Sequence, residues 1–263
     1  MKIPTLYYAP PAPCPYLGGR TEQCAWCSLE NNPPELYDQL VEQGFRRAGF
    51  GAYRPQCGDC NQCISVRIRV NDYKMPRSAK RIIRQTQHLK RVDCDLNKGD
   101  LFDLDDHFRL FQRYIAARHG GGGGGDMMNI TKQEFLDIVR ASPARSHYYQ
   151  WYDSGFDSGF DSGHDLNQNR LLAGCLVDRV HNGLSAVYSF FDPDYEKLSL
   201  GRMMIQQLIA LAKTYELSYV YLGYWVADCK KMQYKANFQP LEYYIDGKWV
   251  PEFTPADPST QEK

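Results

Sequence analysis

The second half of the chain changes its hydrophobic period in an order that limits how it can fold. Residues 147–152, 171–180 and 186–191 have the composition and spacing of strands. Residues 200–215 then place apolar side chains at helical spacing, and residues 219–224 return to a strand pattern. This order predicts a long hairpin, a third strand, a helix and a closing strand, which is a mixed α/β arrangement.

Further elements are expected upstream of this unit. The patterns predict a helix over 34–44, a half-buried strand over 63–70, a helix from Pro76 to about Arg91, an amphipathic helix over 101–118 and a helix over 131–139. Thr131 precedes Glu134 at the spacing of a capping box, which supports the last helix. Residues 1–35 are rich in Pro, Gly, Asn and Cys, and we expect them to be loop.

Three segments have low complexity or a polar composition. Residues 120–125 are six consecutive glycines, and residues 154–165 hold three imperfect copies of Ser-Gly-x-Asp. The tail 251–263 is polar and Pro-rich, so we expect it to be disordered.

Composition excludes some broad classes of protein. The sequence has no apolar run that approaches the roughly 18 residues needed to span a bilayer. The Pro-rich N-terminus does not resemble a signal peptide. The formal net charge is zero, so overall charge favours neither nucleic acid nor membrane. Nine cysteines without a secretory signal favour reduced thiols or a metal site over disulfides, and we therefore expect a cytoplasmic protein.

Several cysteines have the spacing of metal ligands. Cys57, Cys60 and Cys63 lie three residues apart, and Cys14, Cys24 and Cys27 lie upstream. Thiolates at this spacing can reach one tetrahedral zinc ion or hold an iron–sulfur cluster. The candidate ligands are Cys14, Cys57, Cys60 and Cys63. The alternative is a set of reduced, partly buried thiols without metal.

A basic segment interrupts the otherwise balanced charge. Residues 64–92 hold nine Lys or Arg residues and a single acid, Asp72. On the expected helix, one face would carry Arg77, Lys80, Arg81, Arg84, His88 and Arg91. Such a face suits a phosphate backbone, and the alternative is an ordinary solvated helix face.

Two motifs in the second half could form a ligand pocket. Residues 188–194 end a strand in a Pro turn, and Ser199 and Gly201 open the following helix, whose N-terminus could bind an anion. Residues 221–235 place aromatic side chains, including Tyr224, ahead of Lys235 and could line a pocket for a base or a polar substrate. An ordinary helix start and a core edge with surface lysines are the alternatives.

These segments together resemble bacterial members of the arginyl-tRNA–protein transferase family, which include the aspartate/glutamate leucyltransferases. The matching stretches are Cys14–Leu17, Gly44–Arg47, Tyr53–Cys63, Arg77–Arg84, Tyr114–His119, Tyr188–Arg202 and Tyr221–Lys235. The resemblance implies an acetyltransferase-like (GNAT) α/β domain over residues 101–250, behind a smaller cysteine-containing domain over residues 1–100. It implies transfer of leucine or arginine from charged tRNA to proteins that begin with Asp or Glu, which marks them for degradation.

The implied reaction assigns roles to individual residues. An aminoacyl ester is already activated, so the enzyme must position two substrates, accept a proton and stabilise an oxyanion, and no cofactor is required. Tyr188, Asp192 and Asp194 are candidate catalytic residues, although turn chemistry could also explain the two aspartates. The cation for the acceptor's carboxylate would come from Arg67, Arg77, Lys80 or Arg81. Arg118, His119, Ser199, Gly201, Tyr224 and Lys235 complete the candidate substrate site.

Two other classes of protein remain open. An acetyl-CoA-dependent N-acetyltransferase would share the fold but leave the basic helix unexplained. A non-enzymatic metal-ribbon protein that binds nucleic acid would explain the cysteines and the basic face but not the second half.

Overall fold

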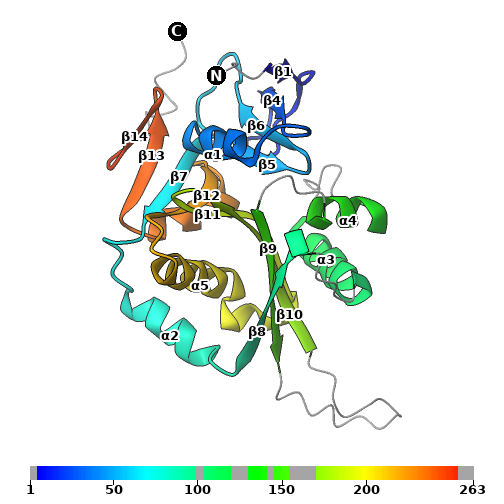
Figure 1. Ribbon diagram of the computed structural model, residues 1–263, viewed down its shortest axis with the longest axis vertical. Coiled ribbons are helices and arrows are strands. Elements are labelled where there is room, and N and C mark those ends of the chain that lie inside the picture. Colours follow the sequence, from blue (N-terminus) through cyan, green and yellow to red (C-terminus); the bar gives the residue numbers. More distant parts are fainter. Residues whose placement is uncertain (1–4, 99–103, 120–129, 141–144, 154–169, 254–263) are drawn as a thin grey trace.

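The computed structural model describes residues 5–98, 104–119, 130–140, 145–153 and 170–253. The glycine run at 120–125, the Ser-Gly-x-Asp repeats at 154–165 and the tail after residue 253 lie outside these ranges. The described part contains one large sheet, helices on both of its faces and a smaller N-terminal sheet (Figure 1).

The large sheet has eight strands in the order β14-β13-β7-β12-β11-β10-β9-β8. Its strands are β7 (Ile64–Arg69), β8 (Leu89–Asp95), β9 (Arg145–Asp153), β10 (Arg170–Val180), β11 (Gly183–Phe191), β12 (Tyr219–Trp225), β13 (Leu241–Ile245) and β14 (Lys248–Val250). All neighbouring pairs are antiparallel except β11 and β12, which are parallel because α5 (Leu200–Thr214) crosses between them.

Apolar cores lie on both faces of this sheet. One face packs against α5 and α2 (Arg77–Gln85), and the other packs against α3 (Leu104–His119) and α4 (Lys132–Arg140) (Figure 1). Short helical segments follow β11 and β12, namely η3 (Pro193–Leu198), α6 (Lys230–Gln233) and η4 (Tyr234–Asn237). Within the described ranges, no helix is long and apolar enough to cross a membrane.

The N-terminal residues are more regular than the sequence predicts. A second sheet has the order β1-β4-β6-β5, formed by β1 (Tyr7–Tyr8), β4 (Cys24–Ser28), β5 (Arg46–Ala48) and β6 (Gly51–Pro55), and β2 (Ala12–Pro13) pairs with β3 (Thr21–Glu22). The expectation of loop over residues 1–35 was wrong, because these strands are too short to show a period. The chain then enters the large sheet at Ile64, well before the domain boundary expected at residue 100.

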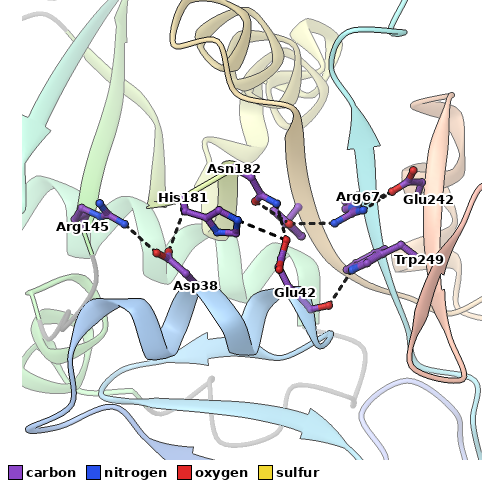
Figure 2. Close-up of polar contacts among 9 residues, drawn as sticks. Asp38, Glu42, Arg67, Arg145, His181, Asn182, Glu242 and Trp249 are labelled. Carbon is purple, nitrogen blue, oxygen red and sulfur yellow. Dashed lines mark hydrogen bonds and ion pairs between the residues drawn. The ribbon is translucent and has the colours of Figure 1, made fainter. Parts of the chain in front are cut away.

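The helix α1 (Pro34–Glu42) attaches the N-terminal sheet to the large one. Figure 2 shows Asp38 paired with Arg145 at 3.0 Å, and the Glu42 carboxylate accepting from the Asn182 amide at 2.7 Å. The Trp249 indole donates to the Glu42 carbonyl at 2.9 Å. Below these contacts, α1 packs its apolar side chains into one core with residues of β4, β6, β10 and β12. The two sheets therefore share buried surface.

The structure confirms most of the other predicted helices and strands and corrects the rest. The helices expected near 34–44, 101–118, 131–139 and 200–215 are present, and the capping box forms, with the Thr131 amide donating to Glu134 at 2.7 Å. The helix expected to reach Arg91 ends at Gln85, where the Thr86 hydroxyl donates to the Ile82 carbonyl. Residues 89–95 form β8 instead, because they pair with the edge of β9. The strand expected over 63–70 is present but buried on both faces.

Candidate active site

The parallel strands β11 and β12 separate in the middle of the large sheet. They pair only where Gly183 to Ser185 face Tyr219 to Tyr221. Beyond that point β11 stays with β10, β12 stays with β7, and β12 carries a bulge between Tyr221 and Gly223. A cavity of about 140 Å³ lies where the two strands part. We call it the splay cavity.

The splay cavity has an apolar wall and a polar, cationic side. The apolar wall comes from β11, β12 and α5, namely Ala186, Val187, Met204, Ile205, Leu208 and Leu222. The other lining residues are Arg46, Cys175, Tyr188, Ser189, Gly201, Tyr234 and Lys235. Within the described ranges, the residues that line this cavity include no Asp or Glu. A small pocket of this kind suits an apolar group next to an anionic one.

Lys235 is a buried amine at this cavity. Its ammonium group donates to the Tyr224 carbonyl at 2.5 Å. Burial, followed by the nearby charges of Arg46 and Arg118, lowers the pKa of Lys235 to about 7. A lysine with such a pKa is partly neutral near pH 7 and can accept a proton.

Arg46 reaches the cavity from β5 of the N-terminal sheet. Its Nη2 donates to the carbonyls of Ala186 and Val187 on β11, at 2.5 and 3.2 Å. Sequence reasoning did not select Arg46 as a site residue, although it lies in the stretch Gly44–Arg47. The Arg46 guanidinium lies against Gly223, where a Cβ would collide with it. Because Gly223 is 177 residues away in the chain, no local sequence pattern could reveal this position.

Tyr188 and Arg118 are candidate residues that the structure brings to this region. Tyr188 lines the cavity, and burial, with Tyr114 nearby, raises the pKa of its hydroxyl. Arg118 donates to the Tyr114 hydroxyl at 2.8 Å and to the Lys231 carbonyl at 3.3 Å. His119 ends α3, and its side chain lies outside the described part of the chain.

The two candidate aspartates do not line the splay cavity. Asp192 is fully buried and accepts from Arg113 at 2.8 and 3.1 Å, from Arg170 at 2.8 Å and from the Asp194 amide. Asp194 is largely exposed and pairs with Arg113 at 2.6 Å. This arrangement favours a structural role for Asp192, which fixes η3 after β11 and leaves its carboxylate little capacity to accept a substrate proton.

The beginning of α5 and the end of β12 lie close to the cavity. Gly201 lines it, and a Cβ there would meet the Phe191 ring at 3.1 Å. Ser199 has a left-handed backbone with φ of 53° and makes no side-chain cap. The Tyr224 hydroxyl is buried and donates to the Tyr53 carbonyl at 2.8 Å, so it holds the N-terminal sheet to β12 and does not line the cavity.

None of the four expected carboxylate-binding cations lines the splay cavity. Arg67 is buried on the α1 side and pairs with Glu242 at 2.6 Å (Figure 2). Its guanidinium also lies over the Tyr219 ring at 3.6 Å. Arg77, Lys80 and Arg81 are exposed on α2. These cations are therefore engaged with protein or directed to solvent.

The four candidate cysteine ligands line a second, smaller cavity. Cys14, Cys57, Cys60 and Cys63 surround a space of about 30 Å³ between β3, β6 and β7, and burial raises the pKa of Cys63, as do the neighbouring thiols. Four thiols are a donor set that suits zinc or an iron–sulfur cluster. As the described side chains are arranged, no three or more of His, Cys, Asp or Glu form a group that could hold a metal ion. The chemistry of the donors fits, but their arrangement does not.

Known proteins resemble the chain along nearly its whole length. The family described as "Arginine-tRNA-protein transferase, C terminus" matches residues 106–245, and its N-terminal counterpart matches residues 12–81. An aspartate/glutamate leucyltransferase of Jannaschia sp. (strain CCS1) is 40% identical over 98% of this chain and 84% of its own. One from Cereibacter sphaeroides (strain ATCC 17029) is 38% identical over 97% of this chain and 85% of its own.

A solved structure, described as "Crystal structure of FemX", covers 83% of this chain and 79% of its own at a TM-score of 0.42 and 9% identity. The N-terminal match covers β4, β5 and β6 of the N-terminal sheet together with β7. The C-terminal match covers the region from α3 to β13, which holds most of the splay cavity. The chain belongs to the arginine-tRNA-protein transferase family.

Proposed function

We propose that this chain transfers leucine from charged tRNA to the N-terminal Asp or Glu of an acceptor protein. Membership of the family supports the transferase, and the names of the relatives supply the leucine and the acidic acceptor. The observation that carries the proposal is the splay cavity, which combines an apolar wall with two cationic side chains and no carboxylate.

The charge of the cavity favours leucine over arginine as the donor residue. A bound arginine would place its guanidinium near Arg46 and Lys235 with no lining Asp or Glu to pair with it. A leucyl side chain instead matches the apolar wall formed by residues such as Met204 and Leu208.

The chemistry we propose uses Lys235 as the proton acceptor. The neutral α-amine of the acceptor attacks the ester carbonyl, and Lys235 in its neutral form takes the proton from the attacking nitrogen. The bond from the carbonyl carbon to the ribose oxygen then breaks, and the Lys235 ammonium returns the proton to that oxygen. The product is a peptide bond, with no net oxidation and no covalent enzyme intermediate. Tyr188, at the same cavity, is positioned to donate to the developing oxyanion.

The separation of β11 and β12 supports an acetyltransferase-like assignment for the sheet. In this proposal the reacting groups meet where the parallel pair opens, next to the first turn of α5. Because an acetyl-CoA-dependent enzyme would share this geometry, calorimetric titration with acetyl-CoA is the control. Tight acetyl-CoA binding together with no aminoacyl transfer would favour that alternative.

The exposed face of α2 is our candidate for the tRNA backbone. Arg77, Lys80, Arg81 and Arg84 are exposed, while Ala79 and Ile82 are buried on the opposite face of the helix. No ion pair within the described residues neutralises these four charges. Such a surface fits a phosphate backbone. Because charged tRNA is a cytoplasmic donor, we propose the cytoplasm as the site of action.

We propose that transfer requires no cofactor and that any zinc or cluster on Cys14, Cys57, Cys60 and Cys63 is structural. Elemental analysis and an absorbance scan of anaerobically purified protein test the second part. A stoichiometric metal that is lost without loss of folded structure would contradict a structural role.

A peptide transfer assay tests the proposed function directly. Purified protein is incubated with leucyl- or arginyl-tRNA and with peptides that begin with Asp, Glu, Asn or Lys. We expect leucine transfer to the Asp and Glu peptides. Transfer of arginine instead, or no transfer of either residue, would contradict the proposal.

A further inference from the structure

Arg46 and Arg47 are adjacent in β5 but differ in how their charges are balanced. Arg47 is buried and forms a two-bond fork with Asp178, at 2.6 and 2.9 Å. Arg46 points to the splay cavity, and no carboxylate of the described residues forms an ion pair with it. Its Nη1, which carries two N–H donors, is buried and has no hydrogen-bond partner among the residues that the structure describes.

The fold holds the Arg46 guanidinium in this place. Gly223 has a φ of +75°, and a Cβ built there would lie 2.0 Å from Nη1 of Arg46. Only a glycine at the bulge of β12 therefore lets the guanidinium cross this strand. On the far side Nη2 is fixed by the carbonyls of Ala186 and Val187, so Arg46 bridges the gap between β11 and β12.

The described surroundings of Arg46 hold no carboxylate paired with its charge. It lies among the hydroxyls of Tyr16, Tyr53, Tyr224 and Tyr234, and Lys235 adds a second positive charge. Glu22 lines the cysteine cavity and forms no ion pair with Arg46. Arg46 is half-buried, and its Nη1 is buried. A guanidinium that is partly withdrawn from water without a counter-charge is unfavourable, and an anionic group entering the cavity would relieve that penalty.

We propose that Arg46 binds the side-chain carboxylate of the acceptor's N-terminal Asp or Glu and so determines the selectivity for acidic N-termini. This inference rests on the proposed function. The unused N–H donors of Nη1 match the oxygens of a carboxylate. The carbonyls of β11 hold the other nitrogen and fix the orientation of the fork.

The test compares transfer to matched peptides that begin with Asp or Asn, which differ in charge but hardly in size. In Arg46→Met, kcat/KM for the Asp peptide should fall about 10- to 100-fold, the range for losing a hydrogen-bonded charge partner, and should approach the value for the Asn peptide. Transfer to the Asn peptide should change little. Arg46→Lys, which keeps the charge but loses the fork, should keep part of the preference.

Two controls separate this inference from its alternatives. Arg54→Met removes another arginine of the N-terminal sheet, one that contacts Phe45 and the Gln43 carbonyl and does not line the cavity, and should leave the Asp-to-Asn ratio unchanged. An equal loss for both peptides in Arg46→Met and Arg46→Lys would show a merely structural role and overturn the inference. If Arg46→Met does not fold, the ratio in Arg46→Lys decides. A wild-type protein that transfers to neither peptide would instead contradict the proposed function.

Discussion

Replacing Lys235 by Met should remove a specific pH dependence of stability. The two side chains have similar length, but Met cannot bind a proton. In the unfolded chain Lys235 has its ordinary pKa of 10.5, whereas burial and the charges of Arg46 and Arg118 lower its pKa in the folded protein to about 7. Between these values the unfolded state binds more protons, so the stability of the wild type rises with pH in this window.

The size of the effect follows from the same two pKa values. The folded lysine is about half protonated at pH 7 and almost neutral at pH 9, while the unfolded lysine stays protonated. Integrated from pH 7 to pH 9, the difference in bound protons amounts to about 2 kcal/mol of added unfolding free energy.

Urea unfolding at pH 7 and pH 9, in reducing buffer, measures this difference. From pH 7 to pH 9, the unfolding free energy of the wild type should rise by about 2 kcal/mol more than that of Lys235→Met. Lys230→Met removes an exposed lysine of α6, and its unfolding free energy should change with pH as that of the wild type does. If the unfolding free energy of Lys235→Met changed with pH as that of the wild type does, Lys235 would not have a lowered pKa. It would then lose its role as the proton acceptor.

The same titration should appear in the pH profile of transfer. Because neutral Lys235 accepts the proton, kcat should increase with pH, with an apparent pKa of about 7. The residual activity of Lys235→Met should lack this rising limb of the pH profile. The groups that face Lys235 are Arg46 from β5, Arg118 from α3, Cys229 before α6 and Cys63 before β7. A limb near pH 7 that persists in Lys235→Met would assign the base elsewhere.

Three further tests, each by substitution, address the surrounding assignments. Asp192→Asn should lower the unfolding free energy by about 1–3 kcal/mol in thermal melts, because two guanidiniums lose their buried acceptor, whereas the exposed Asp194→Asn should cost less. A 100-fold loss of kcat in Asp192→Asn without loss of stability would restore Asp192 as the base. In the double variant Lys80→Gln and Arg81→Gln, the slope of log K for leucyl-tRNA binding against log salt concentration should become shallower by roughly two, because two phosphate contacts are lost. An unchanged slope would show that the tRNA backbone binds elsewhere. Gly223→Ala should displace Arg46 and reduce transfer to Asp peptides more than to Asn peptides.

The sequence predicts local elements well because periodicity is a local property. The helices α1, α3, α4 and α5 and the strands β9 to β12 follow from residues that are close together in the chain. The end of α2 was misplaced because His88 and Arg91 continue the helical spacing of basic residues, whereas pairing of residues 89–95 with β9 decides the structure. A long-range partner therefore overrides a local pattern there.

The site is less accessible to sequence reasoning, for the same physical reason. Lys235 could be proposed as a pocket residue from its aromatic neighbours. Its lowered pKa, however, comes first from burial by the folded chain and then from the charges of Arg46 and Arg118, which are far away in the chain. Likewise, the family resemblance suggested a reactive carboxylate at Asp192, with turn chemistry as the alternative, and the structure surrounds that carboxylate with Arg113 and Arg170. In both cases the chemistry depends on which distant charges the fold brings together.

Charge balance also explains how one small cavity could select both substrates. Leucine is an uncharged donor residue, so the apolar wall on α5 can bind it without any counter-charge. The acceptor must then supply the negative charge that Arg46 and Lys235 lack, and an N-terminal Asp or Glu does so next to the reacting amine. A lysine or arginine at either position would add another positive charge beside Arg46, with no Asp or Glu in the described lining to pair with it, which is unfavourable at short range. The absence of acidic residues from this lining therefore bears on selectivity for the donor and for the acceptor alike.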